Sequence, residues 1–222
     1  MDNTLACSVD LEKEFVLDTY NQIANEFSQT RYNPWPSVKT FIDSLPSKSI
    51  VLDAGCGNGK NMNIRDDLNF IGIDTSENLL KICQERGLNV KMSNIKSIPF
   101  ESNYFDYIVC IAVLHHISTF EDRIQAMNEL IRVLKPGGQM MIQVWAREQT
   151  LSAQFIPFND QNDYFVTWTK VKKSGEKEIS KRYYHLFPES EVDELLLKLN
   201  GIKIIKKFYE ATNWCFIIEK IN

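Results

Sequence analysis

A short apolar segment that runs directly into a glycine-rich turn constrains the fold of this chain more than any other feature. Residues 49–52 have the pattern of a short buried strand, and the turn from Asp53 to Gly59 follows at once, with glycine at every second position from Gly55. Glycine lacks the Cβ that would keep backbone N–H groups away from a ligand. The pattern therefore predicts a strand and a helix joined by a cofactor-binding turn, as in open α/β sheets.

Further short apolar segments alternate with segments of helical spacing along the chain. Strands are expected at residues 70–73, 89–92, 107–111, 140–145, 202–208 and 214–219, and helices at 77–86, after Thr119 and at 189–199. The strand at 107–111 is continuously apolar, which is typical of a parallel sheet covered on both faces. We expect an α/β, Rossmann-like fold, whose mainly parallel seven-stranded sheet has helices on both faces.

Two segments depart from this alternation. We expect residues 1–222 to form a single domain, in which residues 1–48 make an N-terminal helical cap with a break at Pro34 to Pro36. Residues 146–187 interrupt the alternation and are rich in polar and aromatic side chains. Because long insertions in compact domains are usually functional, we expect this one to form part of the substrate site.

Composition excludes several other classes of protein. The net charge of −4 argues against a surface coated with basic side chains, although it leaves room for a local basic patch. No apolar run is long enough to span a bilayer, and the acidic first residues are unlike a secretory or mitochondrial presequence. The five cysteines are scattered without a Cys-x-x-Cys pair, so neither a disulfide framework nor a metal site is expected. These features favour a cytoplasmic protein.

The glycine-rich turn suits one cofactor better than another. Dinucleotides favour Gly-x-Gly-x-x-Gly, whereas here Lys60 occupies the third glycine position and Gly59 comes one residue early. Asp53 would repel a pyrophosphate, but its carboxylate suits the ammonium of a methionine moiety. S-adenosylmethionine has that ammonium and no phosphate, so we expect it as the cofactor, with the loop amides facing its carboxylate. The alternative is a plain turn that packs helix on strand.

Asp74 ends the second expected strand at the same edge of the sheet. A carboxylate there can accept hydrogen bonds from both ribose hydroxyls of a nucleoside cofactor. The alternative role is the N-cap of the helix near Glu77. Since Thr75 and Ser76 are better placed to cap that helix, the ribose role is favoured.

Four segments in chain order resemble the successive motifs of class I S-adenosylmethionine-dependent methyltransferases. They are Asp53 to Gly59, Gly72 to Asp74, Ile98-Pro99-Phe100 leading to Phe105-Asp106, and Leu134 to Gly138. The resemblance implies that Asn94, where the family usually has an acidic residue, accepts a hydrogen bond from the adenine amino group. It also implies that Ile95 and Ile111 flank the adenine. The expected cofactor-binding residues are therefore Asp53, Gly55, Cys56, Gly57, Gly59, Asp74, Thr75, Asn94, Ile95 and Ile111.

Flanking segments narrow this resemblance to the eukaryotic tRNA carboxymethyluridine methyltransferases. They are residues 27–36, 111–116, 182–187 and Asn213-Trp214, so the resemblance spans nearly the whole chain. Members of that family esterify the carboxymethyl group of a modified wobble uridine and work with a small zinc-binding activator subunit. The resemblance implies the same reaction here, with tRNA and an activator as partners in a heterodimer. The expected third strand, residues 88–92, would be an edge strand and is a candidate activator contact.

The substrate-side candidates each have a structural alternative. We expect one of His115 and His116 to face the substrate while the other packs. Arg31 could bind the carboxylate of the cofactor, that of the substrate or a surface acid, and His185 could equally be a structural partner within the insertion. The expected substrate-binding residues are Arg31, His115, His116, Arg182, Tyr183 and His185, with His116 and Arg31 as the catalytic pair.

A carboxylate substrate would also set the mechanism. It is already ionised at neutral pH, so we expect positioning contacts rather than a general base. The stretch from Lys170 to Arg182 is the most basic in the chain and is a candidate for phosphate contacts, although such runs are often only solvated. Two rival functions stay open at this point. One is a small-molecule methyltransferase of the quinone-biosynthesis kind, and the other is a non-enzymatic scaffold with a cofactor fold.

Overall fold

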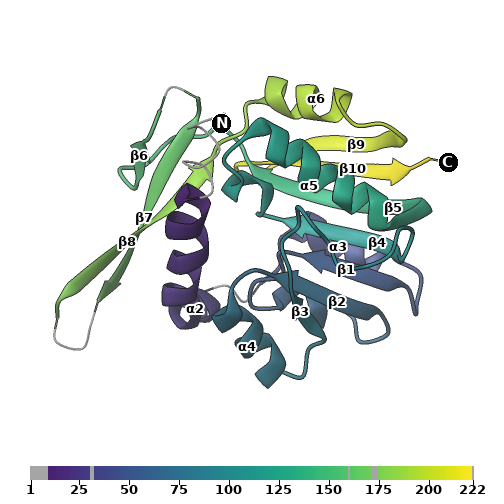
Figure 1. Ribbon diagram of the computed structural model, residues 1–222, viewed down its shortest axis with the longest axis horizontal. Coiled ribbons are helices and arrows are strands. Elements are labelled where there is room, and N and C mark those ends of the chain that lie inside the picture. Colours follow the sequence, from purple (N-terminus) through teal and green to yellow (C-terminus); the bar gives the residue numbers. More distant parts are fainter. Residues whose placement is uncertain (1–9, 31–32, 160, 172–174, 222) are drawn as a thin grey trace.

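A twisted sheet with helices on both sides forms the centre of the molecule (Figure 1). The computed structural model describes residues 10–30, 33–159, 161–171 and 175–221. The seven strands of this sheet lie in the order β3-β2-β1-β4-β5-β10-β9. They are β1 (Ile50–Ala54), β2 (Asn69–Asp74), β3 (Val90–Met92), β4 (Phe105–Ile111), β5 (Leu134–Trp145), β9 (Ile202–Glu210) and β10 (Asn213–Lys220). The first five pair in parallel, and β10 pairs antiparallel with both β5 and β9, which confirms the expected Rossmann-like α/β fold.

The two faces of the sheet are covered by different pairs of helices. Helices α5 (Phe120–Val133) and α6 (Glu189–Leu197) pack on one face, where Leu52 and Ile108 are fully buried. Helices α3 (Pro36–Asp43) and α4 (Glu77–Glu85) pack on the other, against Val51 and Val109. Neighbouring residues of β1 and β4 thus alternate between two cores, which is why these strands are apolar without interruption.

The N-terminal segment forms a helix that stands beside the sheet. A π-helical turn, η1 (Lys13–Asp18), leads into α2 (Thr19–Thr30). The side chain of Asn21 accepts hydrogen bonds from Ser76 and from the backbone N–H of Asn78, at the start of α4. On the opposite side, the Thr19 hydroxyl donates to the carbonyl of Lys181. Helix α2 therefore lies between α4 and the insertion, as Figure 1 shows.

The insertion folds into a small antiparallel sheet of its own, apart from the main sheet (Figure 1). Its strands are β6 (Phe155–Pro157), β7 (Asp163–Val171) and β8 (Lys177–His185), in that order. A bridge between Ala146 and Phe187 joins the two ends of the insertion next to β5. The sequence analysis had assigned no strands to this segment.

The segment after the glycine-rich turn differs from the expectation of a full helix. It forms only a single 3₁₀ turn, η2 (Lys60–Asn63), before the chain enters β2. Asn58, Asn61 and Asn63 make this segment a poor helix former, because asparagine side chains compete for backbone hydrogen bonds and favour turns. As a result, the wall of the site that a longer helix would have built is supplied by α2.

Candidate functional site

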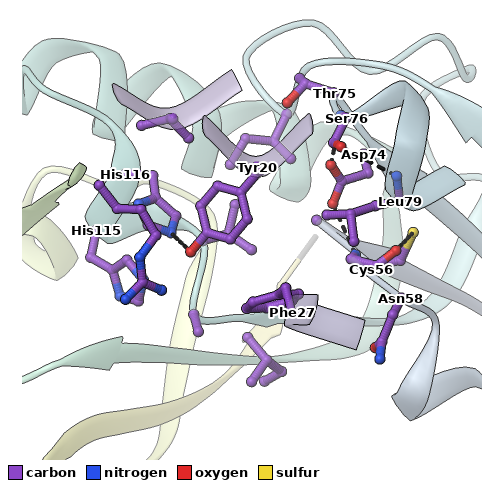
Figure 2. Close-up of a pocket in the computed structure, with 18 of the residues that line it drawn as sticks. Tyr20, Phe27, Cys56, Asn58, Asp74, Thr75, Ser76, Leu79, His115 and His116 are labelled. Atoms are coloured by element: carbon purple, nitrogen blue, oxygen red, sulfur yellow. Dashed lines mark hydrogen bonds between the residues drawn. The ribbon is translucent and has the colours of Figure 1, made fainter. Parts of the chain in front are cut away.

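A cavity of about 970 Å³ opens at the carboxyl ends of β1, β2 and β4. Residues after these strands line one half of it, and α2, β8 and the short turn η3 (Leu114–His116) line the other half. In open α/β sheets this edge is the usual place for a ligand. Figure 2 shows Tyr20 of α2 between these halves, with His116 on one side and Asp74 and Ser76 on the other.

The glycines of the turn are required by close packing. A Cβ on Gly55 would lie 2.3 Å from a methyl carbon of Val113, and one on Gly59 would lie 2.2 Å from Leu88 Cδ1. All three glycines have positive φ, at 77° for Gly55, 55° for Gly57 and 76° for Gly59. Gly55, Cys56 and Gly57 line the cavity, whereas Gly59 faces the packing between the turn and α4 and does not.

The amides of the turn have a different use from the one expected. The N–H groups of Gly55 and Cys56 both donate to the carbonyl of Ile73, at 2.8 and 2.9 Å. The N–H of Gly57 donates to Asp74 Oδ2 at 2.9 Å. These amides tie the turn to β2, so they are not available to the carboxylate of a cofactor.

Asp74 is held in place by two backbone groups. Its Oδ2 accepts from Gly57 and its Oδ1 accepts from the N–H of Ser76 at 2.9 Å. Each oxygen keeps a further lone pair, which is what a pair of ribose hydroxyls needs. Burial raises the pKa of Asp74, although these backbone hydrogen bonds act in the opposite direction. Ser76, and not Asp74, caps α4, because its hydroxyl accepts from Leu79 N.

Asp53 lies beneath the turn instead of on the wall of the cavity. Its side chain is completely buried, and among the described residues neither carboxylate oxygen accepts a hydrogen bond of ordinary geometry. Burial raises the pKa of Asp53 to about 7. A buried acceptor of this kind, two residues before Gly55, is a feature that fits a ligand carrying an ammonium group.

The expected adenine side of the cavity is present in the structure. Thr75, Asn94, Ile95 and Ile111 all line it. The side-chain oxygen of Asn94 accepts from the N–H of Lys96 at 2.9 Å, which fixes the amide and leaves one lone pair of that oxygen. Next to Ile111, Ala112 has φ of 61°, an uncommon value for alanine, and it turns the end of β4 into η3.

In the other half of the cavity, a chain of hydrogen bonds joins α2, β8 and η3. Tyr20 Oη lies 3.0 Å from His116 Nε2 and 3.0 Å from Tyr184 Oη (Figure 2 shows the first of these bonds). Arg182 Nη1 donates to Tyr184 Oη at 2.9 Å. At the far end, His116 Nδ1 lies 2.8 Å from the carbonyl of Tyr183.

The direction of every bond in this chain follows from its two ends. A carbonyl only accepts, so His116 Nδ1 carries a proton. Burial in the cavity wall lowers the pKa of His116 to about 3, so the ring is neutral and its Nε2 accepts. Tyr20 must then donate to His116 and accept from Tyr184, whose oxygen in turn accepts from Arg182.

Arg182 is a buried cation without an anionic partner. Its side chain is 4% exposed, and among the described residues no carboxylate pairs with it and its Nε has no acceptor. The guanidinium stacks over Trp168 and Tyr184, at 5.1 and 5.3 Å from their ring centroids. Because buried charges are normally paired, a guanidinium that lines a cavity in this state favours an anionic ligand.

The two adjacent histidines have different surroundings. His115 is 1% exposed, and its Nδ1 accepts from the N–H of Trp145 at 3.3 Å. Burial holds the pKa of His115 well below its usual value. Both histidines contribute to the cavity wall, but His116, which is only half-buried, is the one that contacts Tyr20.

Two other candidates lie elsewhere. Tyr183 and His185 point away from the cavity, where both bond to Asp163 Oδ1 at 2.7 Å. His185 Nε2 also contacts Glu191 of α6 at 2.9 Å, and the other oxygen of Glu191 accepts from Arg123 at 2.7 Å. Arg31 lies outside the described residues, so its role stays a prediction.

The sequence analysis missed Tyr20 and Tyr184, both of which line the cavity. For Tyr184 a signal existed, since successive strand residues point to opposite faces. In β8, Arg182 and Tyr184 share one face, while Tyr183 and His185 share the other. For Tyr20 no signal existed, because its contact with His116 spans 96 residues of sequence.

Comparisons with known proteins agree with this geometry. Residues 52–142 match a family model described as a methyltransferase domain. A chain in the solved complex between the Haloferax volcanii Trm112 methyltransferase activator and the putative methyltransferase has the same fold. Its TM-score is 0.66 at 14% identity, over 93% of this chain and 98% of that one.

Two curated relatives are similar over almost all of this chain. The tRNA (carboxymethyluridine(34)-5-O)-methyltransferase of Schizosaccharomyces pombe is 37% identical, over 96% of this chain and 99% of the relative. The tRNA (carboxymethyluridine(34)-5-O)-methyltransferase alkbh8 of Xenopus tropicalis is 35% identical, over 95% of this chain. This chain spans 41% of that vertebrate relative's length.

The fold, with its cavity at the carboxyl ends of β1, β2 and β4, is that of the class I methyltransferases. Within this class, the chain belongs to the tRNA (carboxymethyluridine(34)-5-O)-methyltransferase family. Across the described ranges, none of the helices has the length and apolar character needed to cross a membrane.

Proposed function

We propose that the chain is an S-adenosylmethionine-dependent methyltransferase that esterifies the carboxymethyl group of a modified wobble uridine in tRNA. The observation that carries this proposal is Arg182, a buried guanidinium on the cavity wall without a carboxylate partner among the described residues. A substrate carboxylate would supply the missing anion. The S. pombe and Xenopus relatives are named for this reaction.

The cofactor half of the cavity fits S-adenosylmethionine. Asp74 would accept from the ribose hydroxyls, and Asn94, Ile95 and Ile111 would surround the adenine. Asp53, a buried carboxyl beneath the turn whose oxygens lack a hydrogen-bond donor of ordinary geometry, is our candidate acceptor for the ammonium group. When bound, this cofactor supplies an activated methyl group on a sulfonium.

The substrate half supports positioning rather than proton transfer. A carboxylate is ionised at neutral pH and needs no base to become a nucleophile. His116 is neutral with its Nε2 already accepting from Tyr20, so it has no free lone pair for a substrate proton. Arg182 would orient the carboxylate, and the walls of the cavity would exclude water from it. Arg31 stays a second candidate for the same carboxylate.

We also propose a zinc-binding activator subunit as a partner. The solved Haloferax volcanii complex joins an activator to a chain of this fold. Strand β3 lies at the edge of the sheet, and Met92 on it is 55% exposed. An open edge strand invites pairing with another chain. Co-expression with the activator is therefore expected to raise solubility and activity, whereas full activity of a well-behaved monomer alone would contradict this partner.

The proposed reaction can be tested through the anion that Arg182 is thought to bind. We would compare wild type and Arg182→Gln on tRNA that carries carboxymethyluridine, with labelled S-adenosylmethionine and the activator present. The wild type is expected to transfer label in a form that mild base releases, as an ester requires. The variant is expected to lose about tenfold or more of kcat/KM, since hydrogen bonds to charged groups contribute about 1.5–3 kcal/mol. Equal rates in the two proteins, or transfer to a metabolite extract in place of tRNA, would contradict the proposal.

A further inference from the structure

The hydrogen-bond chain in the substrate half gives a role to the N-terminal helix. We propose that Tyr20 is a positioning residue of the methyl-transfer site, whose phenol couples His116 to Tyr184 and so fixes the Arg182 guanidinium. This inference rests on the proposed function, because it assigns Arg182 to the substrate carboxylate. It adds α2 to the parts of the molecule that build the site.

The Tyr20 hydroxyl uses both its proton and its oxygen in hydrogen bonds. Its single proton goes to His116 Nε2, and its oxygen accepts from Tyr184, both at 3.0 Å. The neutral imidazole has one lone pair, and that lone pair is used. Removing the Tyr20 oxygen would therefore take a donor from His116 Nε2 and an acceptor from the Tyr184 hydroxyl at once.

The packing of Tyr184 determines how removal of the Tyr20 oxygen would affect Arg182. Tyr184 is 2% exposed and stacks on Trp145, with ring centroids 4.4 Å apart. Its hydroxyl is the described acceptor for Arg182. Losing the Tyr20 contact would remove one of the bonds that orient this hydroxyl, and the position of the guanidinium bonded to it would be less well fixed. Among the described residues, no hydrogen bond joins Asp74 of the cofactor half to this chain of hydrogen bonds.

Tyr20 is one of several groups that face the His116 ring. The others are Arg182 and Tyr184 on β8 and His115 on η3. Burial and the nearby Arg182 lower the pKa of His116, and the Tyr20 hydroxyl adds a hydrogen bond to the neutral form of the ring. Tyr20 therefore fixes the orientation of a ring that burial already keeps neutral.

The test uses Tyr20→Phe and Tyr184→Phe, with Tyr209→Phe as the matched control. Tyr209 is 43% exposed on β9 and its hydroxyl donates to the Glu148 carbonyl, far from this chain of bonds. Thermal melts would check that each variant is folded. We expect about tenfold lower kcat for Tyr20→Phe and Tyr184→Phe, with unchanged cofactor affinity and no effect of Tyr209→Phe.

An NMR measurement on the free protein makes the inference independent of turnover. The chain has three histidines, so long-range ¹H–¹⁵N spectra of histidine-labelled protein resolve each ring. His116 is expected to carry its proton on Nδ1 in the wild type, and its Nε2 signal is expected to shift in Tyr20→Phe, because Nε2 loses the hydrogen bond from the Tyr20 hydroxyl. An Nε2 signal that does not move in Tyr20→Phe, or a kcat equal to that of Tyr209→Phe, would overturn the role of Tyr20. A wild type inactive on carboxymethyluridine tRNA, with the His116 signals as expected, would instead overturn the proposed function and with it any methyl-transfer role for Tyr20.

Discussion

At the scale of single residues, the site depends on polar groups whose partners are almost all specified. Asp74 accepts from two backbone N–H groups, and His116 is bonded through both ring nitrogens. Asp53 and Arg182 are exceptions: the oxygens of Asp53 lack a described donor of ordinary geometry, and the charge of Arg182 is not matched by a described carboxylate. A polar group whose hydrogen bonds are all made within the protein keeps its neighbours in position, whereas a buried group without a partner gains free energy when a ligand supplies one. This contrast separates residues that position from residues that bind.

Asp74→Ala is expected to weaken S-adenosylmethionine binding by about tenfold or more, since two ribose hydroxyls would lose a charged acceptor. Isothermal titration calorimetry measures the change directly. Asp66→Ala, an exposed carboxylate in the loop before β2, is the control and should leave the affinity unchanged. Equal affinities of the wild type and Asp74→Ala would show that the ribose binds elsewhere.

The pH–rate profile is expected to be nearly flat from about pH 6 to 9 at saturating substrate. The pKa of His116 is lowered to about 3, so the ring is neutral throughout this range and has no proton to lose. His116→Asn should keep measurable activity, because asparagine offers both a donor and an acceptor. Single-turnover kinetics would isolate the chemical step. A steep rise near pH 6.5 that disappears in His116→Asn would reveal a catalytic base and favour a hydroxyl substrate.

At the scale of elements, the insertion is tied to the domain by a buried ionic cluster. His185 of the small sheet bonds to Asp163 on its own sheet and to Glu191 of α6, which also pairs with Arg123 of α5. Both ring nitrogens of His185 face carboxylates, and Arg123 is 3% exposed. This cluster holds β8 in place, and β8 carries Arg182 and Tyr184 on its other face.

Glu191→Gln is expected to destabilise the protein by about 3 kcal/mol, because Arg123 would keep a buried charge without its partner. Urea denaturation followed by circular dichroism gives the change in the free energy of unfolding. Glu189→Gln on the same helix is the control, since its pair with Lys207 is half-exposed and should change stability by about 0.5 kcal/mol at most. Similar values for the two variants would mean that the cluster adds little to stability.

Sequence patterns predicted the elements of the sheet better than those of the site. Apolar runs, and the glycines that end some of them, located all seven strands of the main sheet, because burial on both faces leaves a continuous apolar pattern in the sequence. The sheet within residues 146–187 was missed, since its strands mix charged and aromatic side chains. Without the strand period, Tyr183 and His185 could not be distinguished from Arg182 and Tyr184. The chain of hydrogen bonds through Tyr20 could not be predicted from sequence patterns, because it joins three segments that are distant in the sequence.

At the scale of the whole molecule, a net charge of −4 must be reconciled with a tRNA substrate. The β7–β8 hairpin projects from the body (Figure 1) and carries part of the basic stretch from Lys170 to Arg182. Not all cations of this stretch are available to bind phosphates, since Lys170 pairs with Glu26 of α2 at 2.5 Å and Arg182 is buried in the site. Among the described residues of this stretch, Lys177 and Lys181 are the exposed cations that could reach phosphates, and Lys172 and Lys173 lie outside the described residues.

Replacing both Lys177 and Lys181 by glutamine is expected to weaken tRNA binding and to reduce the slope of log K against log salt by about 1–2. Lys170→Gln is the matched control and should alter the slope less, because Glu26 already neutralises that charge. Fluorescence anisotropy with labelled tRNA at several salt concentrations measures both effects. An unchanged slope in the double variant would return these lysines to the status of solvated surface.

The central claim is the identity of the product. The most direct measurement is mass spectrometry of tRNA nucleosides after incubation of tRNA with the protein, its activator and methyl-labelled S-adenosylmethionine. The account predicts that the label appears in the methyl ester of carboxymethyluridine, at the wobble position, and only in tRNA that carried the free acid. Label in any other nucleoside, or in a small metabolite while tRNA stays unlabelled, would contradict it.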